Sequence, residues 1–181
     1  MQKELLLKIV KEAIESEFNQ KSIDKQKLIE KNPELKEKGA VFVTLHKDNK
    51  LRGCIGSLVA HRSLLDDLIS NAKSSAFKDP RFPPLRRDEL EKIDIEISIL
   101  SPYKQIFYKN IDDLKKKIRP NIDGVILKLG SYQATFLPQV WEDIPSFDSF
   151  FANLCQKAGI KVSGCLDRNP TIFIYQVKKV K

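Results

Sequence analysis

The chain has 181 residues and a formal net charge of +8, from 32 basic and 24 acidic side chains. Its length allows a hydrophobic core, and a composition of 41% hydrophobic and 31% charged residues excludes wholesale disorder. No apolar run approaches the roughly 20 residues that span a bilayer, and the charged, amphipathic start is not typical of a signal peptide, so we expect a cytoplasmic protein without a membrane partner.

The first quarter of the chain predicts a helix and a hairpin. Apolar residues recur at helical spacing over 3–18. A polar, lysine-rich connection follows and ends at Gly39. Ala40–Leu45 is apolar and β-branched, which is typical of a strand. The polar Lys47–Lys50 is its turn, and Leu51–Leu58 is the partner strand.

The next segment predicts a helix, a rigid loop and a strand. Ser63–Ala76 has a period near 3.6, with Ser63 as a candidate N-cap. The three prolines of Lys78–Pro84 end that helix. Asp88–Ile93 adds a short helical turn, and apolar residues then alternate with polar ones over Ile93–Leu100, which indicates a half-buried strand.

The second half of the chain is less regular at first. Pro102–Pro120, with a short helix after Asn110, is the best candidate for a small lobe, within about 102–122. Beyond it the patterns predict two strands around a Gly130-Ser131 turn of the II′ kind, then a helix closed by glycine, then a strand: Val125–Leu129, Tyr132–Phe136, Phe147–Gly159 and Thr171–Lys178. Because hairpins dominate over β-α-β alternation, the sequence predicts one α+β domain over 1–181, with a largely antiparallel sheet and packed helices.

The stretch Leu51–Leu58 is the strongest candidate for a functional site. Gly53 and Gly56, two of only seven glycines, flank Cys54 there. Glycine weakens a strand unless another group must approach the backbone, so the pattern indicates a thiol that can be reached. The neighbouring Arg52 favours the thiolate form, which makes Cys54 a candidate nucleophile. The alternative is a small hydrophobic residue buried in a strand.

The hairpin register decides between these two interpretations, and the sequence leaves it open. With a two-residue loop, Cys54 lies across from Val43 on the core face. With a three-residue loop it lies across from Thr44, on the face of His46 and Arg52. Only the second register would bring thiol, imidazole and guanidinium to one surface.

Other candidates lie outside this strand. Asp79 and Arg81 belong to a rigid, charged segment that either locks a loop by an ion pair, the favoured interpretation, or lines a cleft beside the hairpin. Gln139 offers a polar contact near Trp141. Phosphate-binding motifs do not fit Arg52–Gly56, which lacks the lysine and hydroxyl of a P-loop and has the wrong glycine spacing for a dinucleotide site.

The remaining cysteines and the histidines predict no further chemistry. An odd, small number of cysteines argues against a disulfide framework and for reduced thiols. Cys155, in a helical apolar stripe, is predicted to be core, and Cys165 to be exposed or capping. His46 and His61 are interpreted as surface residues, and without C-x-x-C spacing a zinc site has no visible ligand set.

The positive charge favours an anionic partner. Acidic residues are interspersed with the basic ones, however, and the basic clusters are short: Lys115–Lys117 with Arg119, and Lys178, Lys179 and Lys181. A solvated lysine-rich surface explains most of the charge. Nucleic-acid binding, or a purely regulatory contact with a protein, is therefore the alternative function.

Five stretches together resemble the AMMECR domain family, also called AmmeMemoRadiSam system protein A. Leu51–Ser57 resembles its signature, and four others match in order: Gly39–Leu45, Asn71–Leu85, Phe136–Glu142 and Leu154–Ile160. His46 falls where the family tends to have a basic residue, which weakens a Cys–His pair.

The resemblance implies a two-part fold, with a larger lobe from both chain ends, a smaller inserted lobe, and the signature strand in a cleft between them. It also implies a Memo-type protein and a radical-SAM enzyme as partners, and it specifies neither reaction nor cofactor. We therefore expect a modification or small-ligand module. Its candidate nucleophile is Cys54, and its candidate ligand-binding residues are Arg52, Gly53, Gly56, Thr44, Asp79, Arg81 and Gln139.

Overall fold

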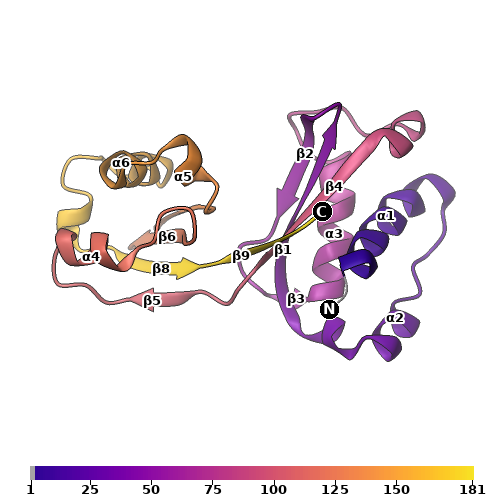
Figure 1. Cartoon of the computed structure of the whole chain (residues 1–181), viewed down its shortest axis with the longest axis horizontal. Coiled ribbons are helices and arrows are strands. Elements are labelled where there is room, and N and C mark those ends of the chain that lie inside the picture. Colours follow the sequence, from indigo (N-terminus) through magenta and orange to yellow (C-terminus); the bar gives the residue numbers. More distant parts are fainter. Residues whose placement is uncertain (1–2) are drawn as a thin grey trace. The chain divides into compact units, whose positions relative to one another are not determined.

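The computed structural model describes residues 3–181 and shows an α+β fold with antiparallel sheets, as the sequence predicts. Two compact units make up the chain: Met1–Leu100 with Lys178–Lys181, and Ser101–Val177. The first unit thus contains both ends of the chain, and the second is one inserted segment that includes 102–122 and continues well beyond it (Figure 1). The first two residues of the charged N-terminal segment lie outside the described residues.

The first unit contains a five-stranded sheet with helices on one face. Its strands are β1 (Lys38–Lys47), β2 (Lys50–Gly56), β3 (Arg62–Ser63), β4 (Ile93–Leu100) and β9 (Val177–Val180). The order is β2-β1-β4-β9, with β3 paired to β1, and β1 runs antiparallel to β2, β3 and β4. β1 is therefore the central strand on which the predicted hairpin is built.

Two helices supply the core of this unit. α1 (Lys3–Asn19) and α3 (Leu64–Phe77) lie on the same side of the sheet in Figure 1 and bury their apolar stripes in one cluster with the core-facing residues of β1. Both helices match the sequence prediction, and the Ser63 hydroxyl accepts a hydrogen bond from the Asp66 amide as the N-cap of α3. Within residues 3–181, none of the helices combines the length and apolar character that a bilayer crossing requires.

Short helices in this unit depend less on hydrophobic pattern. α2 (Lys25–Lys31) lies in the connection that the sequence leaves without structure, because none of its residues is buried and it has no apolar stripe to show. A 3₁₀ turn, η1 (Pro33–Lys36), follows it. The predicted helical turn before β4 is present as η2 (Arg87–Lys92).

The second unit has its own sheet and core. Its strands, in the order β5-β8-β6-β7, are β5 (Lys104–Ile106), β8 (Thr171–Tyr175), β6 (Gly124–Leu129) and β7 (Tyr132–Phe136). The helical segments are α4 (Ile111–Lys117), α5 (Val140–Asp143), α6 (Phe147–Lys157) and the 3₁₀ turn η3 (Leu166–Arg168). The predicted β6–β7 hairpin is confirmed, with φ of 58° at Gly130 in its turn.

The prediction of reduced thiols is wrong for two of the three cysteines. Cys155 and Cys165 form a disulfide, and each is only 1% exposed, so Cys155 is core as predicted and Cys165 is not exposed. Cys165 does occupy the N-cap position of the 3₁₀ turn η3, without a side-chain capping hydrogen bond. The reason for the disulfide is local chain reversal. Gly159 has φ of 76°, and the Ile160 amide bonds back to the Cys155 carbonyl at 2.9 Å, as in a Schellman cap. The chain after α6 therefore returns past Cys155, which a count of cysteines does not reveal.

Candidate functional site

The register of Cys54 comes from a turn and a bulge together. The hairpin turns at Asp48–Asn49, where φ is 52° and 59°, the conformation of a type I′ turn. This two-residue loop alone would pair Cys54 with Val43. The ladder shifts by one residue at a β-bulge that leaves Arg52 without a partner, and beyond it Cys54 lies across from Thr44.

Cys54 belongs to a row of polar side chains that crosses three strands. Thr44 alternates with the core residues of β1 and so lies on the sheet face opposite the helices. Its partners, Cys54 on β2 and Glu96 on β4, share that face with His46, and we call these four residues the thiol face. The Thr44 hydroxyl donates to the Cys54 sulfur at 3.3 Å, and the thiol itself is free and half-buried.

Asp79 and Arg81 form hydrogen bonds with the backbone of Cys54 along the outer edge of β2. The Cys54 amide donates to Asp79 at 2.9 Å, and Arg81 donates to the Cys54 carbonyl at 3.2 Å. Arg81 also donates to both carboxylate oxygens of Asp79, from Nε at 2.9 Å and from Nη2 at 2.7 Å. The segment thus forms the ion-pair lock that the sequence favours, and its partner is the cysteine strand.

Asp79 and Arg81 also shift each other's pKa. The Arg81 guanidinium holds the pKa of the Asp79 carboxyl well below its ordinary range, against the opposing effect of burial. Asp79 in turn raises the pKa of Arg81, and the charge of a Cys54 thiolate adds to that increase. The carboxylate of Asp79 and the guanidinium of Arg81 are therefore both held in their charged forms.

The Arg52 side chain pairs with Glu89 and not with Cys54. It donates to Glu89 from Nε at 3.2 Å and from Nη2 at 3.0 Å, and both residues are buried. Lys47 and the Arg86 amide also bind Glu89, and the hydrogen bond from Arg52 is the main cause that holds the pKa of Glu89 well below its ordinary range. The arginine next to Cys54 in sequence is therefore committed to a buried ion pair.

Gly53 and Gly56 are each packed closely against other atoms of the protein, which leave no room for a side chain. A Cβ at Gly53 would lie 2.1 Å from the Ser75 carbonyl oxygen of α3, and one at Gly56 would lie 2.2 Å from the Phe42 ring. Gly53 therefore allows α3 to approach the strand, and Gly56 makes room for an aromatic side chain on the thiol face.

The other predicted residues do not contact Cys54. His46 lies on the thiol face without a hydrogen bond to the thiol, and His61 is exposed, with Nδ1 2.9 Å from the Val59 carbonyl oxygen. Gln139 belongs to the second unit, directly before α5, and its Oε1 is buried without a partner among residues 3–181. Over that same range, no three His, Cys, Asp or Glu side chains are grouped so as to hold a metal ion.

Sequence reasoning missed Glu96. Its side chain is only 10% exposed and forms ion pairs with Lys179 at 3.7 Å and Lys181 at 2.6 Å. The alternation in Ile93–Leu100 indicates that Glu96 points away from the core, but its ion pairs come from the far end of the chain, from Lys179 on β9 and from Lys181 just after it. A buried carboxylate thus lies across Thr44 from the thiol.

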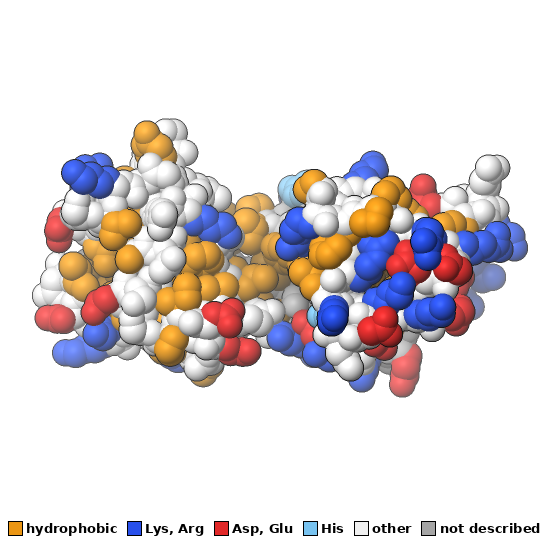
Figure 2. Space-filling model, turned by 90° about the horizontal axis from the view of Figure 1, so that it is seen from above, with side chains coloured by type: hydrophobic (Ala, Val, Ile, Leu, Met, Phe, Trp, Pro, Cys, Tyr) orange, Lys and Arg blue, Asp and Glu red, His pale blue; other side chains and the backbone are white. Residues whose placement is uncertain are grey.

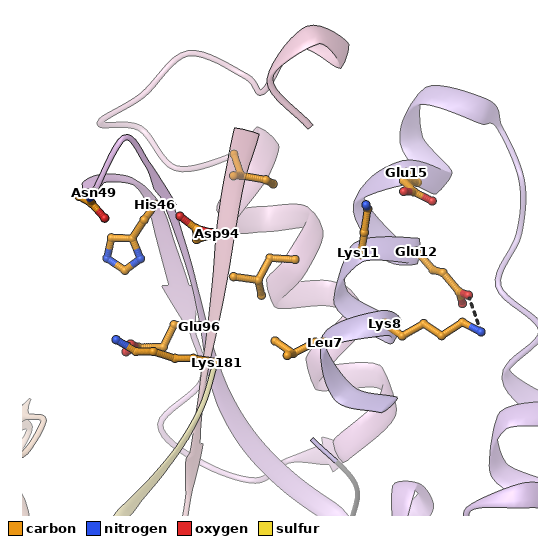
Figure 3. A pocket seen from close by; sticks show the side chains of 12 residues that line it. Leu7, Lys8, Lys11, Glu12, Glu15, His46, Asn49, Asp94, Glu96 and Lys181 are labelled. Atoms are coloured by element: carbon orange, nitrogen blue, oxygen red, sulfur yellow. Dashed lines mark ion pairs between the residues drawn. The ribbon is translucent and has the colours of Figure 1, made fainter. Parts of the chain in front are cut away.

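A pocket of about 980 Å³ reaches Glu96 from the side of β4 and α1. Figure 3 shows His46, Asn49, Asp94, Glu96 and Lys181 on one side of β4, with the side chains of α1 opposite. The pocket thus joins the Glu96 end of the thiol face, while Cys54 is not among its lining residues.

The end of the signature is fixed by another buried carboxylate that sequence reasoning did not single out, Asp67. Asp67 of α3 is fully buried and accepts hydrogen bonds from Ser57 at 2.7 Å, Arg62 at 2.7 Å and the Val41 amide at 2.8 Å. Asn71, one turn later, donates to Asp67 and to Ser57. This network anchors the strand end to α3, and the amphipathic pattern shows the helix but not the contacts of its polar residues.

These features define an α+β protein of two units in which an edge strand carries a free cysteine, fixed by an aspartate–arginine pair. Residues 7–180 match the AMMECR1 family. The chain belongs to this family, which confirms the resemblance drawn from the signature.

Relatives and a solved structure agree with this assignment. Protein SSO0193 of Saccharolobus solfataricus is 38% identical over 178 residues, covering 93% of this chain and 76% of the relative. A protein of Methanothermobacter thermautotrophicus is 36% identical over 148 residues, covering 79% and 75%. The crystal structure of the uncharacterised protein PH0010 from Pyrococcus horikoshii has a TM-score of 0.82 and 33% identity, covering 96% of this chain and 88% of that one.

Proposed function

We propose that this chain is a cytoplasmic modification or small-ligand module in which Cys54 is the nucleophile. The observation that carries the proposal is the free thiol on β2, whose sulfur accepts the Thr44 hydroxyl while the Arg81 guanidinium donates to the carbonyl of the same residue. In the reaction that this arrangement suits, the Cys54 sulfur forms a bond to an electrophilic carbon. The leaving group departs with its bonding electrons, and the thiol proton passes to water.

Alkylation of the folded protein tests this proposal. If Cys54 is a nucleophile assisted by the Thr44 hydroxyl that donates to its sulfur, iodoacetamide should modify it faster at pH 7 than it modifies a reference cysteine peptide. Cys54→Ala is the control and should take up no label under non-reducing conditions, since the other two cysteines are paired. Modification slower than that of the peptide would contradict the proposal.

A variant of Thr44 provides a second test of whether Cys54 is a nucleophile or a structural cysteine. Thr44→Val removes the hydroxyl that donates to the sulfur while nearly keeping the side-chain shape, so the alkylation rate should fall. A cysteine that serves only packing would show no such dependence.

The resemblance further supports a Memo-type protein and a radical-SAM enzyme as partners. We propose that they work with this chain, which co-purification of the Memo-type protein would test. The cytoplasmic location is compatible with the disulfide, because both sulfurs are buried and thiol–disulfide exchange requires access.

Nucleic-acid binding is not the function we favour, because many of the basic residues that suggested it are paired with acids. Lys117 binds Asp113, Arg119 binds Asp123, and Lys179 and Lys181 bind Glu96. Figure 2 likewise shows basic and acidic side chains interleaved over the unit at the right. A nucleic-acid interface typically presents a clustered basic patch or stripe.

A further inference from the structure

Asp79 contacts both Cys54 and Arg81. Its carboxylate accepts a hydrogen bond from the Cys54 amide. It also accepts hydrogen bonds from Arg81, from the backbone amide at 3.1 Å and from the guanidinium nitrogens Nε and Nη2. The Asp79 side chain is 2% exposed, whereas that of Arg81 is 53% exposed. A buried, multiply bonded carboxylate thus holds a half-exposed arginine.

We propose that Asp79 is a positioning residue that holds the Arg81 guanidinium beside the Cys54 thiol, and that this fits the site to an anionic electrophile, one whose reactive carbon lies next to a carboxylate. The inference rests on the proposed function and names the class of ligand for the same thiol.

The local backbone restricts how Arg81 can move. Pro80 separates the two residues and fixes its own φ, and the Phe82 amide donates to the Asp79 carbonyl at 3.1 Å, closing the turn. Nη2, the nitrogen that donates to the Cys54 carbonyl, also donates to Asp79. The orientation of the Arg81 guanidinium therefore depends on that carboxylate.

Arg81 retains donors for a ligand. Nε and Nη2 bind Asp79 and the Cys54 carbonyl, whereas Nη1 makes no hydrogen bond to any residue in 3–181. A guanidinium recognises a carboxylate through such free N–H groups. The anion would then lie beside the sulfur that attacks.

The other charged and titratable groups near the thiol come from three elements. β1 contributes His46 on the same face, β4 contributes Glu96 across Thr44, and β2 contributes Arg52, which is neutralised by Glu89. Glu96 is in turn paired with two lysines. Arg81 is therefore the cation placed closest to the Cys54 backbone.

Two probes of the same size test the proposal. Iodoacetate and iodoacetamide both react when the thiolate sulfur displaces iodide, forming a sulfur–carbon bond, and only the first carries a carboxylate. The ratio of their rates, divided by the same ratio for a reference cysteine peptide, therefore measures recognition of the anion. We expect this ratio to exceed one in the unmodified protein.

Three variants test whether Asp79 and Arg81 cause the preference for iodoacetate. Asp79→Asn and Arg81→Met should each lower the normalised ratio about threefold to tenfold, and the double variant should lower it no further, because the two residues act as one unit. Asp88→Asn is the matched control, since Asp88 also pairs with an arginine two residues away but is 63% exposed. It should leave the ratio unchanged.

The outcomes separate positioning from charge alone. If Asp79 acted only through its negative charge, Asp79→Asn would increase the reaction with iodoacetate, and that result overturns the proposal. An unchanged ratio overturns it as well. If Asp79→Asn does not fold, Asp79→Glu keeps the charge but displaces the guanidinium, and an undiminished ratio in that variant counts against positioning. Slow reaction with both probes refutes the proposed function, while the ratio still tests Asp79.

Discussion

Glu89→Gln is expected to lower the free energy of unfolding by about 3–5 kcal/mol, because it leaves the buried charge of Arg52 without its partner. The side chains of Arg52 and Glu89 are 11% and 8% exposed, and Nη1 of Arg52 already lacks a partner among the described residues. Urea denaturation followed by far-UV circular dichroism measures the loss.

Glu91→Gln is the matched control for this prediction. Glu91 lies on the same turn, η2, and pairs with Lys11 at 3.3 Å, but its side chain is 77% exposed. Exposed pairs contribute about 0–1 kcal/mol. The two variants therefore compare the same chemical change at a buried and at an exposed position.

The pH dependence of the loss has a definite sign. The folded pKa of Glu89 lies below its ordinary value of 4.5, so its stabilising contribution is present above about pH 4.5 and is lost as the pH falls further. The gap between the unmodified protein and Glu89→Gln should therefore be widest at neutral pH and narrow in acid. A gap of constant size from pH 7 to pH 3 would show that charge is not its cause.

The sequence predicts α1, α3, β1 and β4 of the first unit because each has a regular hydrophobic pattern, whereas it misses α2, which has no buried residue. It could not choose the hairpin register, since both alternatives assumed uninterrupted pairing. The structure combines the shorter loop with a bulge at Arg52. One extra residue moves Cys54 across from Thr44 and leaves Arg52 free to pair with Glu89, and no local propensity indicates where a bulge falls.

The residues of the candidate site can be predicted from local sequence patterns, but the contacts between them cannot. Residue type and glycine spacing indicated Cys54, and proline content indicated a rigid segment at Asp79 and Arg81. Their contact joins residues 25 positions apart, and the ion pairs of Glu96 require lysines from the end of the chain. Such contacts arise only when the strands assemble.

Removing the disulfide is expected to destabilise the Ser101–Val177 unit. The bond joins residues 10 positions apart, and a loop of that size contributes about 2–3 kcal/mol through the entropy of the unfolded chain. The double variant Cys155→Ala/Cys165→Ala should therefore unfold at a lower urea concentration. The fluorescence of Trp141, the only tryptophan and a member of this unit's core, reports the transition.

Cys54→Ala is the control, since it removes a thiol of the other unit and should leave the Trp141 transition in place. Counting thiols checks the bond directly. Alkylation of the urea-denatured protein should label one cysteine without reductant and three after reduction. Three labels without reductant would show that the pair is not oxidised, and the expected difference in stability would then disappear.

The same variant also tests how the chain after α6 is held. Ile160 is bonded to the Cys155 carbonyl through the Schellman cap, so the reversal does not depend on the sulfurs alone. Amide hydrogen exchange in the double variant should increase over 161–168, from the residue after the cap to the end of η3, while α6 stays protected. Loss of protection throughout α6 would instead mean that the disulfide, and not the apolar stripe with its cap, holds the helix in the core.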